Sequence, residues 1–179
     1  MELGFTPQSQ VKILIARKEI DEAVTRLASE IRRDYQGKQP LFIGILKGSF
    51  IFLADLIRRL DMPVEIDFVK LSSYAAAKET SGKVKMVQGL RTQVKDRDIL
   101  VVEDIVDTGL TTSLLLDYLK KRKPASLKLC ALTDKPSRRR VSVPIDYLGF
   151  TVPDKFIVGY GTDCNEKFRY LPDICFIEN

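Results

Sequence analysis

Three carboxylates and three threonines surround one turn in the stretch ILVVEDIVDTGLTT, residues 99–112. Glu103, Asp104 and Asp107 can accept hydrogen bonds, take up a proton or bind a divalent cation. The segment DTGLTT is instead typical of an anion site, because Thr hydroxyls and the free N–H groups at the start of a helix donate to phosphate. Since carboxylates and phosphates repel each other, the two halves of this stretch need a ligand that separates them.

A ribose 5-phosphate meets both requirements. Its hydroxyls donate hydrogen bonds to carboxylates, while its phosphate occupies the amide-rich turn. If the sugar also carries a pyrophosphate, Mg²⁺ would bridge the diol and the diphosphate, because this ion prefers oxygen and uses few protein ligands. The stretch contains neither a GxxxxGK[ST] loop nor a GxGxxG loop, so these two phosphate motifs do not explain it.

Two simpler interpretations of the acids stay open. Asp107 could cap the helix that follows, since Asp and Thr are common N-caps and an acidic first turn complements the helix dipole. The acids could also form a phosphoacceptor pocket of the receiver type. That pocket draws its acids from separate strands, so the compact order EDxxDTG argues against it.

The sequence contains no histidine. This excludes Ser-His-Asp catalysis, Cys-His catalysis and His-ligated zinc, so a general base must be a carboxylate, Lys, Tyr or Cys. Cys130, Cys164 and Cys175 lack CxxC spacing and predict neither a disulfide framework nor a thiolate metal site. We therefore expect a reducing, cytoplasmic location, in agreement with a first segment that lacks the features of a targeting sequence.

The elements that must position these residues follow from the hydrophobic pattern. One domain, residues 1–179, is expected from the length, and the net charge of +5 mildly favours an acidic partner. Apolar strands alternate with amphipathic helices, which predicts an α/β fold with a mostly parallel sheet and helices on both faces. The predicted helices cover 19–35, 50–60 and 110–122, and the predicted strands cover 41–46, 64–71, 83–88, 98–103, 126–132, 146–150 and 174–178. The polar segment 72–83 is predicted to be a long loop, and the apolar run 41–57 is interrupted by charged residues and predicts no membrane span.

The segment VVEDIVDTGLTT resembles the phosphoribosyl-diphosphate signature of type I phosphoribosyltransferases, and its acidic position 107 is similar to the 6-oxopurine branch, the hypoxanthine-guanine phosphoribosyltransferases. Further stretches resemble that family in the same order along residues 46–172. They are LKGS (46–49), SSY (72–74), DKPSRR (134–139), VPDKFIVGYGTD (152–163) and NEKFRYLP (165–172).

The resemblance implies a type I phosphoribosyltransferase-like fold with a small hood and a flexible lid loop. It implies a purine-salvage enzyme that needs Mg²⁺ and transfers 5-phosphoribosyl from its 1-diphosphate to hypoxanthine or guanine. It further implies a homodimer or homotetramer in the cytoplasm, with no nucleic acid and no membrane as partner.

The resemblance also assigns roles to the acids. Glu103 and Asp104 bind the ribose hydroxyls, partly through Mg²⁺, and Asp163 matches a second Mg²⁺ position. Asp107 is the base that takes the proton from purine N7 as N9 attacks the sugar. The segment TGLTT holds the sugar phosphate, with Thr108, Gly109, Leu110 and Thr111 as its substrate-binding residues, and Ile105 is a further substrate-binding position.

Other matched positions contact the pyrophosphate and the base. The Leu46–Lys47 peptide is expected to be cis and, with Gly48, to aim backbone amides at the pyrophosphate, which Arg169 also contacts. Lys135 donates to the exocyclic O6 of the base. The remaining matches are the stacking residue Phe156, the base-edge backbone of Ile157, and the lid residues Ser73 and Tyr74.

An alternative from another class is a nucleotide-sensing regulatory protein on the same fold that binds RNA. Its basic surface would comprise Lys120, Lys121, Arg122, Lys123, Arg138, Arg139 and Arg140. The carboxylate at position 107 and the pair of Lys135 and Phe156 favour a purine enzyme instead. Among purines, a preference for xanthine stays open, because hypoxanthine, guanine and xanthine differ at C2, an edge read by backbone groups.

Overall fold

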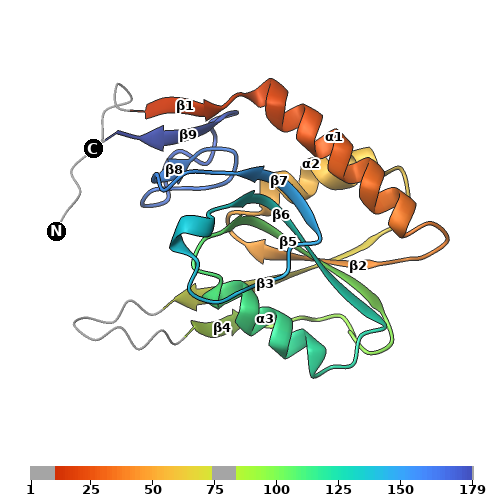
Figure 1. The fold of residues 1–179 in the computed structure, drawn as a ribbon. Helices are drawn as coiled ribbons and strands as arrows, with labels where there is room; N and C mark the ends of the chain where they lie inside the picture. The colour runs from red at the N-terminus through yellow and green to blue at the C-terminus, as the bar shows by residue number, and fades with distance from the viewer. Residues whose placement is uncertain (1–10, 74–83, 179) are drawn as a thin grey trace.

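The computed structural model describes residues 11–73 and 84–178, and its centre is a six-stranded sheet (Figure 1). The strand order is β4-β3-β2-β5-β6-β7, and all neighbouring strands run parallel except β3 and β4. The predicted mostly parallel sheet is thus confirmed. The strand bounds are β2 (Leu41–Leu46), β3 (Glu65–Ser73), β4 (Val84–Gln88), β5 (Asp98–Val106), β6 (Ser126–Asp134) and β7 (Tyr147–Thr151).

Helices cover both faces of this sheet, as the alternating pattern predicts. Helices α1 (Arg17–Asp34) and α2 (Phe50–Leu60) pack on one face, and α3 (Leu110–Lys120) packs on the other (Figure 1). Each helix buries its apolar stripe because these residues recur at helical spacing. In α1 the buried residues are Ile20, Ala23, Val24, Leu27, Ala28 and Ile31. Within the described ranges, none of the helices is long and apolar enough to cross a membrane.

A second, smaller sheet forms the hood that the resemblance implies. It has the order β1-β9-β8 and is antiparallel. It lies near the ends to which the arrows of the parallel strands point (Figure 1). Its strands are β1 (Val11–Ile15), β8 (Ile157–Val158) and β9 (Ile174–Ile177), of which only β9 is predicted from the sequence. The predicted lid falls almost entirely on 74–83, which lie outside the described residues.

Strand β5 is longer than predicted. It continues to Val106, since β6 pairs beside it as far as Asp134 and extends the ladder. Glu103 and Asp104 therefore lie within a buried strand, whereas the prediction placed them at its end. Their carboxylates are consequently held by the core of the sheet.

The chain order places a crevice at the carboxyl ends of β2 and β5. From β2 the chain proceeds to β3 and β4 on one side, while β5, β6 and β7 lie on the other side. In open α/β sheets, ligands bind outside the carboxyl ends of strands at such a switch point. Lys47 follows β2 and Asp107 follows β5, so both lie at this position.

Candidate active site

A cavity of about 610 Å³ opens at this switch point, and we call it the site cavity. Its lining residues come from segments far apart in the sequence. They are Lys47, Gly48, Asp104, Ile105, Asp107, Lys135, Arg138, Asp154, Lys155, Phe156, Ile157, Thr162, Asp163 and Arg169. Cations and carboxylates face the same space, which suits a ligand that carries both donors and anionic groups.

Most of the predicted site residues line this cavity, but some do not. The predicted residues Leu46, Glu103, Thr108, Gly109, Leu110 and Thr111 are absent from its lining. Four of these six form the turn and the first residues of α3, beside Asp107. Ser73 ends strand β3, and Tyr74 lies outside the described residues. The structure thus brings together the positions expected to contact base and pyrophosphate more completely than those expected to contact the sugar phosphate.

Glu103 and Asp104 form a buried acid pair. Their relative exposures are 6% and 9%, and Glu103 Oε2 has no hydrogen-bond partner. Burial raises the pKa of both carboxyls, and the charge of Asp104 raises the pKa of Glu103 further. A Cβ on residue 48 would collide with the Asp104 carboxylate, so the close approach of this loop requires Gly48. Glu103 is therefore short of a donor, and the pair suits a ligand that offers hydroxyls or positive charge.

The donor set fits Mg²⁺ better than a metal with many protein ligands. Among residues 11–73 and 84–178, no three His, Cys, Asp or Glu side chains converge as a metal cluster. The predicted ligands Glu103, Asp104 and Asp163 thus do not form one closed site. Asp104 and Asp163 do line the cavity, and Mg²⁺ commonly uses one or two carboxylates together with substrate oxygens.

The side chain of Asp107 faces the cavity and does not cap α3. The N-cap of α3 is Gly109, with φ of 81° and no side-chain capping bond, so the capping interpretation of Asp107 is wrong. Its Oδ1 is buried without a hydrogen bond, and Nε of Arg138 lies 3.5 Å away. The Nε of Arg139 donates to the backbone carbonyl of Asp107 at 3.1 Å. The backbone is thus fixed, while the carboxylate is left for a ligand.

The opposite wall of the cavity suits a planar base. Phe156 is 55% exposed although it is large and apolar, and it lines the cavity, so it offers a ring face. Lys135 is 5% exposed, and its Nζ donates to the carbonyl of Lys155 at 2.7 Å. Its Nζ also lies 4.0 Å from Oδ1 of Asp154, and an ammonium has three protons, so one remains to donate to a ligand.

Cations gather where the pyrophosphate is expected. The Leu46–Lys47 peptide is cis, as the resemblance implies. Lys47 Nζ lies 2.8 Å from Oε1 of Glu166, and Arg169 Nη2 lies 2.7 Å from Oδ1 of Asp163 and 3.0 Å from Oε2 of Glu166. Lys47 and then Arg169 lower the pKa of Glu166.

Several residues of the site were not predicted to belong to it, and Arg138 was named only for the alternative RNA-binding surface. Arg138, Asp154, Lys155 and Thr162 line the cavity, and Glu166 contacts two of its cations. All five lie inside stretches that carry the resemblance. Their types alone gave no signal, because charged turn residues usually face solvent, and only the fold directs them into the cavity.

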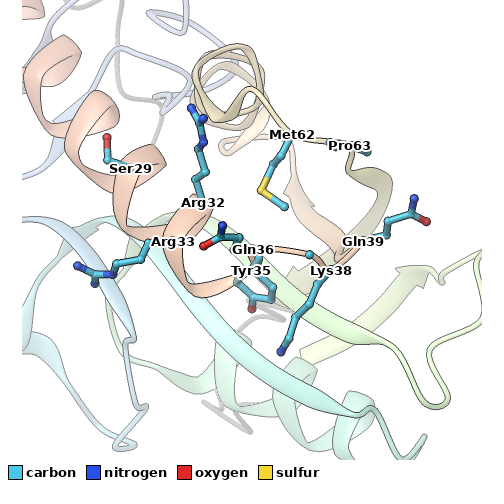
Figure 2. A pocket seen from close by; sticks show the side chains of 10 residues that line it. Ser29, Arg32, Arg33, Tyr35, Gln36, Lys38, Gln39, Met62 and Pro63 are labelled. Carbon is cyan, nitrogen blue, oxygen red and sulfur yellow. The ribbon is translucent and has the colours of Figure 1, made fainter.

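A larger pocket of about 730 Å³ lies at the opposite, amino edge of the sheet, and we call it the basic pocket (Figure 2). It is lined by Ser29, Arg32, Arg33, Tyr35, Gln36, Gly37, Lys38, Gln39, Met62 and Pro63. Each of its three cations already has an acidic partner. Arg32 pairs with Asp61 at 3.4 Å, Arg33 with Asp34 at 3.5 Å, and Lys38 with Asp98 at 3.2 Å. Size therefore does not identify the site, and the charges of the basic pocket are explained by these pairs.

Comparisons with known proteins agree with this geometry. The model of the phosphoribosyl transferase domain matches residues 11–165. A hypoxanthine-guanine phosphoribosyltransferase of Bacillus subtilis is 47% identical over 91% of each chain. The bifunctional protein TilS/HprT of Listeria innocua is 45% identical over 91% of this chain, which spans only 25% of that relative's length.

A crystal structure of a hypoxanthine-guanine phosphoribosyltransferase from Bacillus anthracis has the same architecture. Its TM-score is 0.88 at 46% sequence identity, and the alignment covers 93% of this chain and 98% of that one. The domain match extends over the whole six-stranded sheet and over strands β1 and β8 of the hood. On this basis, the chain belongs to the phosphoribosyl transferase domain family.

Proposed function

We propose that this protein transfers the 5-phosphoribosyl group from 5-phosphoribosyl 1-diphosphate to hypoxanthine and guanine, which gives IMP or GMP and pyrophosphate. The observation that carries the proposal is the convergence in one cavity of Lys47, Asp107, Lys135, Phe156 and Arg169. These residues come from separate segments, and each offers the group that one part of these two substrates requires. The names of the relatives from Bacillus subtilis and Bacillus anthracis support the same reaction.

In this proposal the base lies between the ring of Phe156 and the carboxylate of Asp107. The ammonium of Lys135 donates to O6, which favours 6-oxopurines over 6-aminopurines. As N9 attacks the anomeric carbon and pyrophosphate leaves, Asp107 accepts the proton from N7. Its Oδ1 has no hydrogen bond to give up beforehand, which suits this role.

The sugar binds along β5 and the turn that follows. Glu103 and Asp104 accept hydrogen bonds from the ribose diol, in agreement with a buried pair in which Oε2 of Glu103 lacks a donor. The first turn of α3 offers backbone N–H groups to the 5-phosphate, because these have no partner within the helix. Lys47 and Arg169 neutralise the pyrophosphate.

We propose Mg²⁺ as the cofactor, held by Asp104 and Asp163, with Glu103 beside them. When bound, the ion neutralises charge on the departing pyrophosphate and orients its oxygens. The raised pKa values of Glu103 and Asp104 support this assignment, since a nearby cation would favour their ionised forms.

The RNA-binding alternative receives no support from the predicted basic surface. Arg138 lies 3.5 Å from Asp107 and 3.7 Å from Asp154, and Arg139 pairs with Asp134. The charges of these two side chains are thus paired with carboxylates that lie in or beside the site cavity. Arg122 stacks on the ring of Tyr118 at 3.4 Å.

One assay tests the proposal. Pyrophosphate release is measured with 5-phosphoribosyl 1-diphosphate and Mg²⁺ and with adenine, hypoxanthine, guanine, xanthine or uracil as acceptor. We expect release with hypoxanthine and guanine, and little with adenine or uracil. Release with xanthine alone would correct the substrate, and the absence of release with every base would refute the proposed enzyme.

We also propose a cytoplasmic homodimer or homotetramer that needs neither nucleic acid nor a membrane. The three cysteines are buried and unpaired, which suits a reducing compartment. Light scattering coupled to size-exclusion chromatography tests the oligomeric state. A monomeric mass at micromolar concentration would contradict this part of the proposal.

A further inference from the structure

Glu166 contacts two cations of the site cavity. They are Lys47, which is 119 residues away in the sequence, and Arg169, which is three residues away. Its Oε1 lies 2.8 Å from Nζ of Lys47, in the loop after β2. Its Oε2 lies 3.0 Å from Nη2 and 3.3 Å from Nε of Arg169. One carboxylate thus contacts both cations with its two oxygens, which is how a diphosphate would use them.

The backbone holds Glu166 in this position. Its φ is 62°, an uncommon conformation for a residue with a side chain, and its N–H donates to Oδ2 of Asp163 at 2.7 Å. Arg169 contacts Asp163 through the same guanidinium and donates to the carbonyl of Gly161 at 2.7 Å. The carboxylate is therefore placed by the loop, in contrast to a freely swinging surface side chain.

We propose that Glu166 is a displaceable counter-ion of the pyrophosphate site. It occupies Lys47 and Arg169 when no pyrophosphate is bound, and the pyrophosphate group must displace it from both cations. Glu166 thereby weakens pyrophosphate binding and speeds the release of this product. This inference rests on the proposed function, because that function assigns Lys47 and Arg169 to the pyrophosphate.

The exposure of Glu166 suits a contact that breaks in every catalytic cycle. Its side chain is 61% exposed, and ion pairs in such positions contribute little to stability. The pyrophosphate carries more negative charge, so it competes well for the same cations. A carboxylate that stays nearby also repels the product, which favours dissociation when release limits turnover.

The test measures the affinity for pyrophosphate by calorimetry, at constant Mg²⁺, in the wild type and in Glu166→Gln. We expect the variant to bind pyrophosphate about tenfold more tightly, because two competing ion pairs and one repulsive charge are removed. In steady state, product inhibition by pyrophosphate should become stronger to a similar extent. A second variant, Glu166→Ala, should behave alike, which separates the loss of charge from any effect of the new amide.

Glu178→Gln is a matched control. Glu178 pairs with Lys12 at 2.6 Å and is 55% exposed, but it lies at the end of β9 and outside the cavity lining. The same change of charge there should leave pyrophosphate affinity unaltered. Unchanged or weaker pyrophosphate binding in both Glu166 variants would overturn the inference, since a residue that only positions Lys47 and Arg169 gives weaker binding when it is lost.

The failure of this inference is distinguishable from the failure of the proposed function. If the wild type releases pyrophosphate with hypoxanthine but the Glu166 variants bind pyrophosphate no more tightly, only the inference fails. If no base supports pyrophosphate release in the wild type, the proposed function fails. The inference then fails with it, because its assignment of Lys47 and Arg169 depends on that function.

Discussion

At the carboxyl edge of the sheet, burial raises the pKa values of Glu103 and Asp104, whereas at the amino edge the pKa of Asp34 is lowered from an ordinary value of 3.8 to about 2. Asp34 accepts hydrogen bonds from the hydroxyl of Tyr147 at 2.7 Å and from Lys128 at 3.0 Å. At the amino edge the Asp34 carboxylate is satisfied and stabilises the fold, whereas at the carboxyl edge Oε2 of Glu103 and Oδ1 of Asp107 have no hydrogen-bond partner. This difference locates the chemistry, because unpaired buried acids are costly unless a ligand or metal uses them.

The site cavity and the basic pocket also differ in whether their polar groups have partners. The basic pocket, whose lining side chains Figure 2 shows, is larger than the site cavity, at about 730 Å³ against 610 Å³. Its cations, however, have acidic partners. The hydroxyl of Tyr35 in this pocket is buried without a hydrogen bond, and burial raises the pKa of this phenol, so it stays neutral. In the site cavity, Oδ1 of Asp107 is a buried carboxylate oxygen with no hydrogen bond, and its ion pair with Arg138 at 3.5 Å leaves it able to accept one from a ligand. A buried carboxylate oxygen without a hydrogen bond is therefore a better guide to the site than volume.

The largest effect should come from removing the carboxylate of Asp107. We expect Asp107→Asn to lower kcat by about 100-fold or more, because general base catalysis is lost, while Tm stays near that of the wild type. The measurement is steady-state pyrophosphate release with hypoxanthine, together with thermal unfolding by circular dichroism. Near-normal kcat in a folded variant would refute the assigned role.

The matched control for that variant lies at the other edge. Arg32→Gln removes a cation of the basic pocket that is 57% exposed and paired with Asp61. Both kcat and KM should stay within about twofold of the wild type, since surface ion pairs contribute little. A larger change would show that the basic pocket is coupled to the reaction.

Next in size is the loss of Lys135. Lys135→Met keeps the length of a side chain that is 5% exposed but removes its charge. We expect kcat/KM with hypoxanthine to fall roughly 10- to 100-fold, the cost of a hydrogen bond from a charged group, while adenine is affected less. Lys95→Met, at a side chain that is 62% exposed, is the control and should leave kcat/KM unchanged with both bases. An equal loss with both bases would contradict recognition of O6 by Lys135.

At the amino edge, we expect a substitution to change the stability of the fold. Asp34→Asn should lower the free energy of unfolding by about 1–2 kcal/mol at pH 7, discounted because Asp34 is partly exposed. Its pKa is lower in the folded state, so the unfolded chain binds more protons below pH 4, and this stabilisation is present at neutral pH and lost as pH falls towards 2. In urea unfolding, the difference between variant and wild type should therefore narrow below pH 4, and a constant difference would contradict this cause.

Much of the fold was predictable because its helices and buried strands leave clear patterns. Helix α2 and strand β2 have the predicted bounds, since Ser49 and Asp61 lie at the ends of the helix and LFIGIL is apolar throughout. Strands β1 and β8 were missed. A strand of two residues, Ile157 and Val158, has no measurable period, and β1 is identified only by its pairing with β9.

The candidate site was predictable where one local stretch supplies the residues. The acids of β5 lie next to the phosphate-binding turn in the sequence. Because carboxylates repel a phosphate, this arrangement predicts a ligand that separates the two. Arg138 and Glu166 could not be assigned, because their partners Asp107 and Lys47 are remote in sequence and only tertiary packing joins them. The family resemblance identified the motifs that contain Arg138 and Glu166, but it did not predict which residues these two side chains contact.

The smallest expected effect is a gain in the free energy of unfolding, opposite in sign to the loss expected for Asp34→Asn. The pKa of Glu103 is higher in the folded state, so above its ordinary value of 4.5 the folded protein binds more protons and stability falls as pH rises. Glu103→Gln carries no charge to desolvate, and we expect it to raise the free energy of unfolding by about 0.5–1 kcal/mol at pH 8, with little gain at pH 4. Urea unfolding of the ligand-free protein at both pH values is the measurement. A variant that is less stable at pH 8 than the wild type would show that the Glu103 carboxylate is satisfied in the fold, and the contrast between the two edges of the sheet would then rest on Asp107 alone.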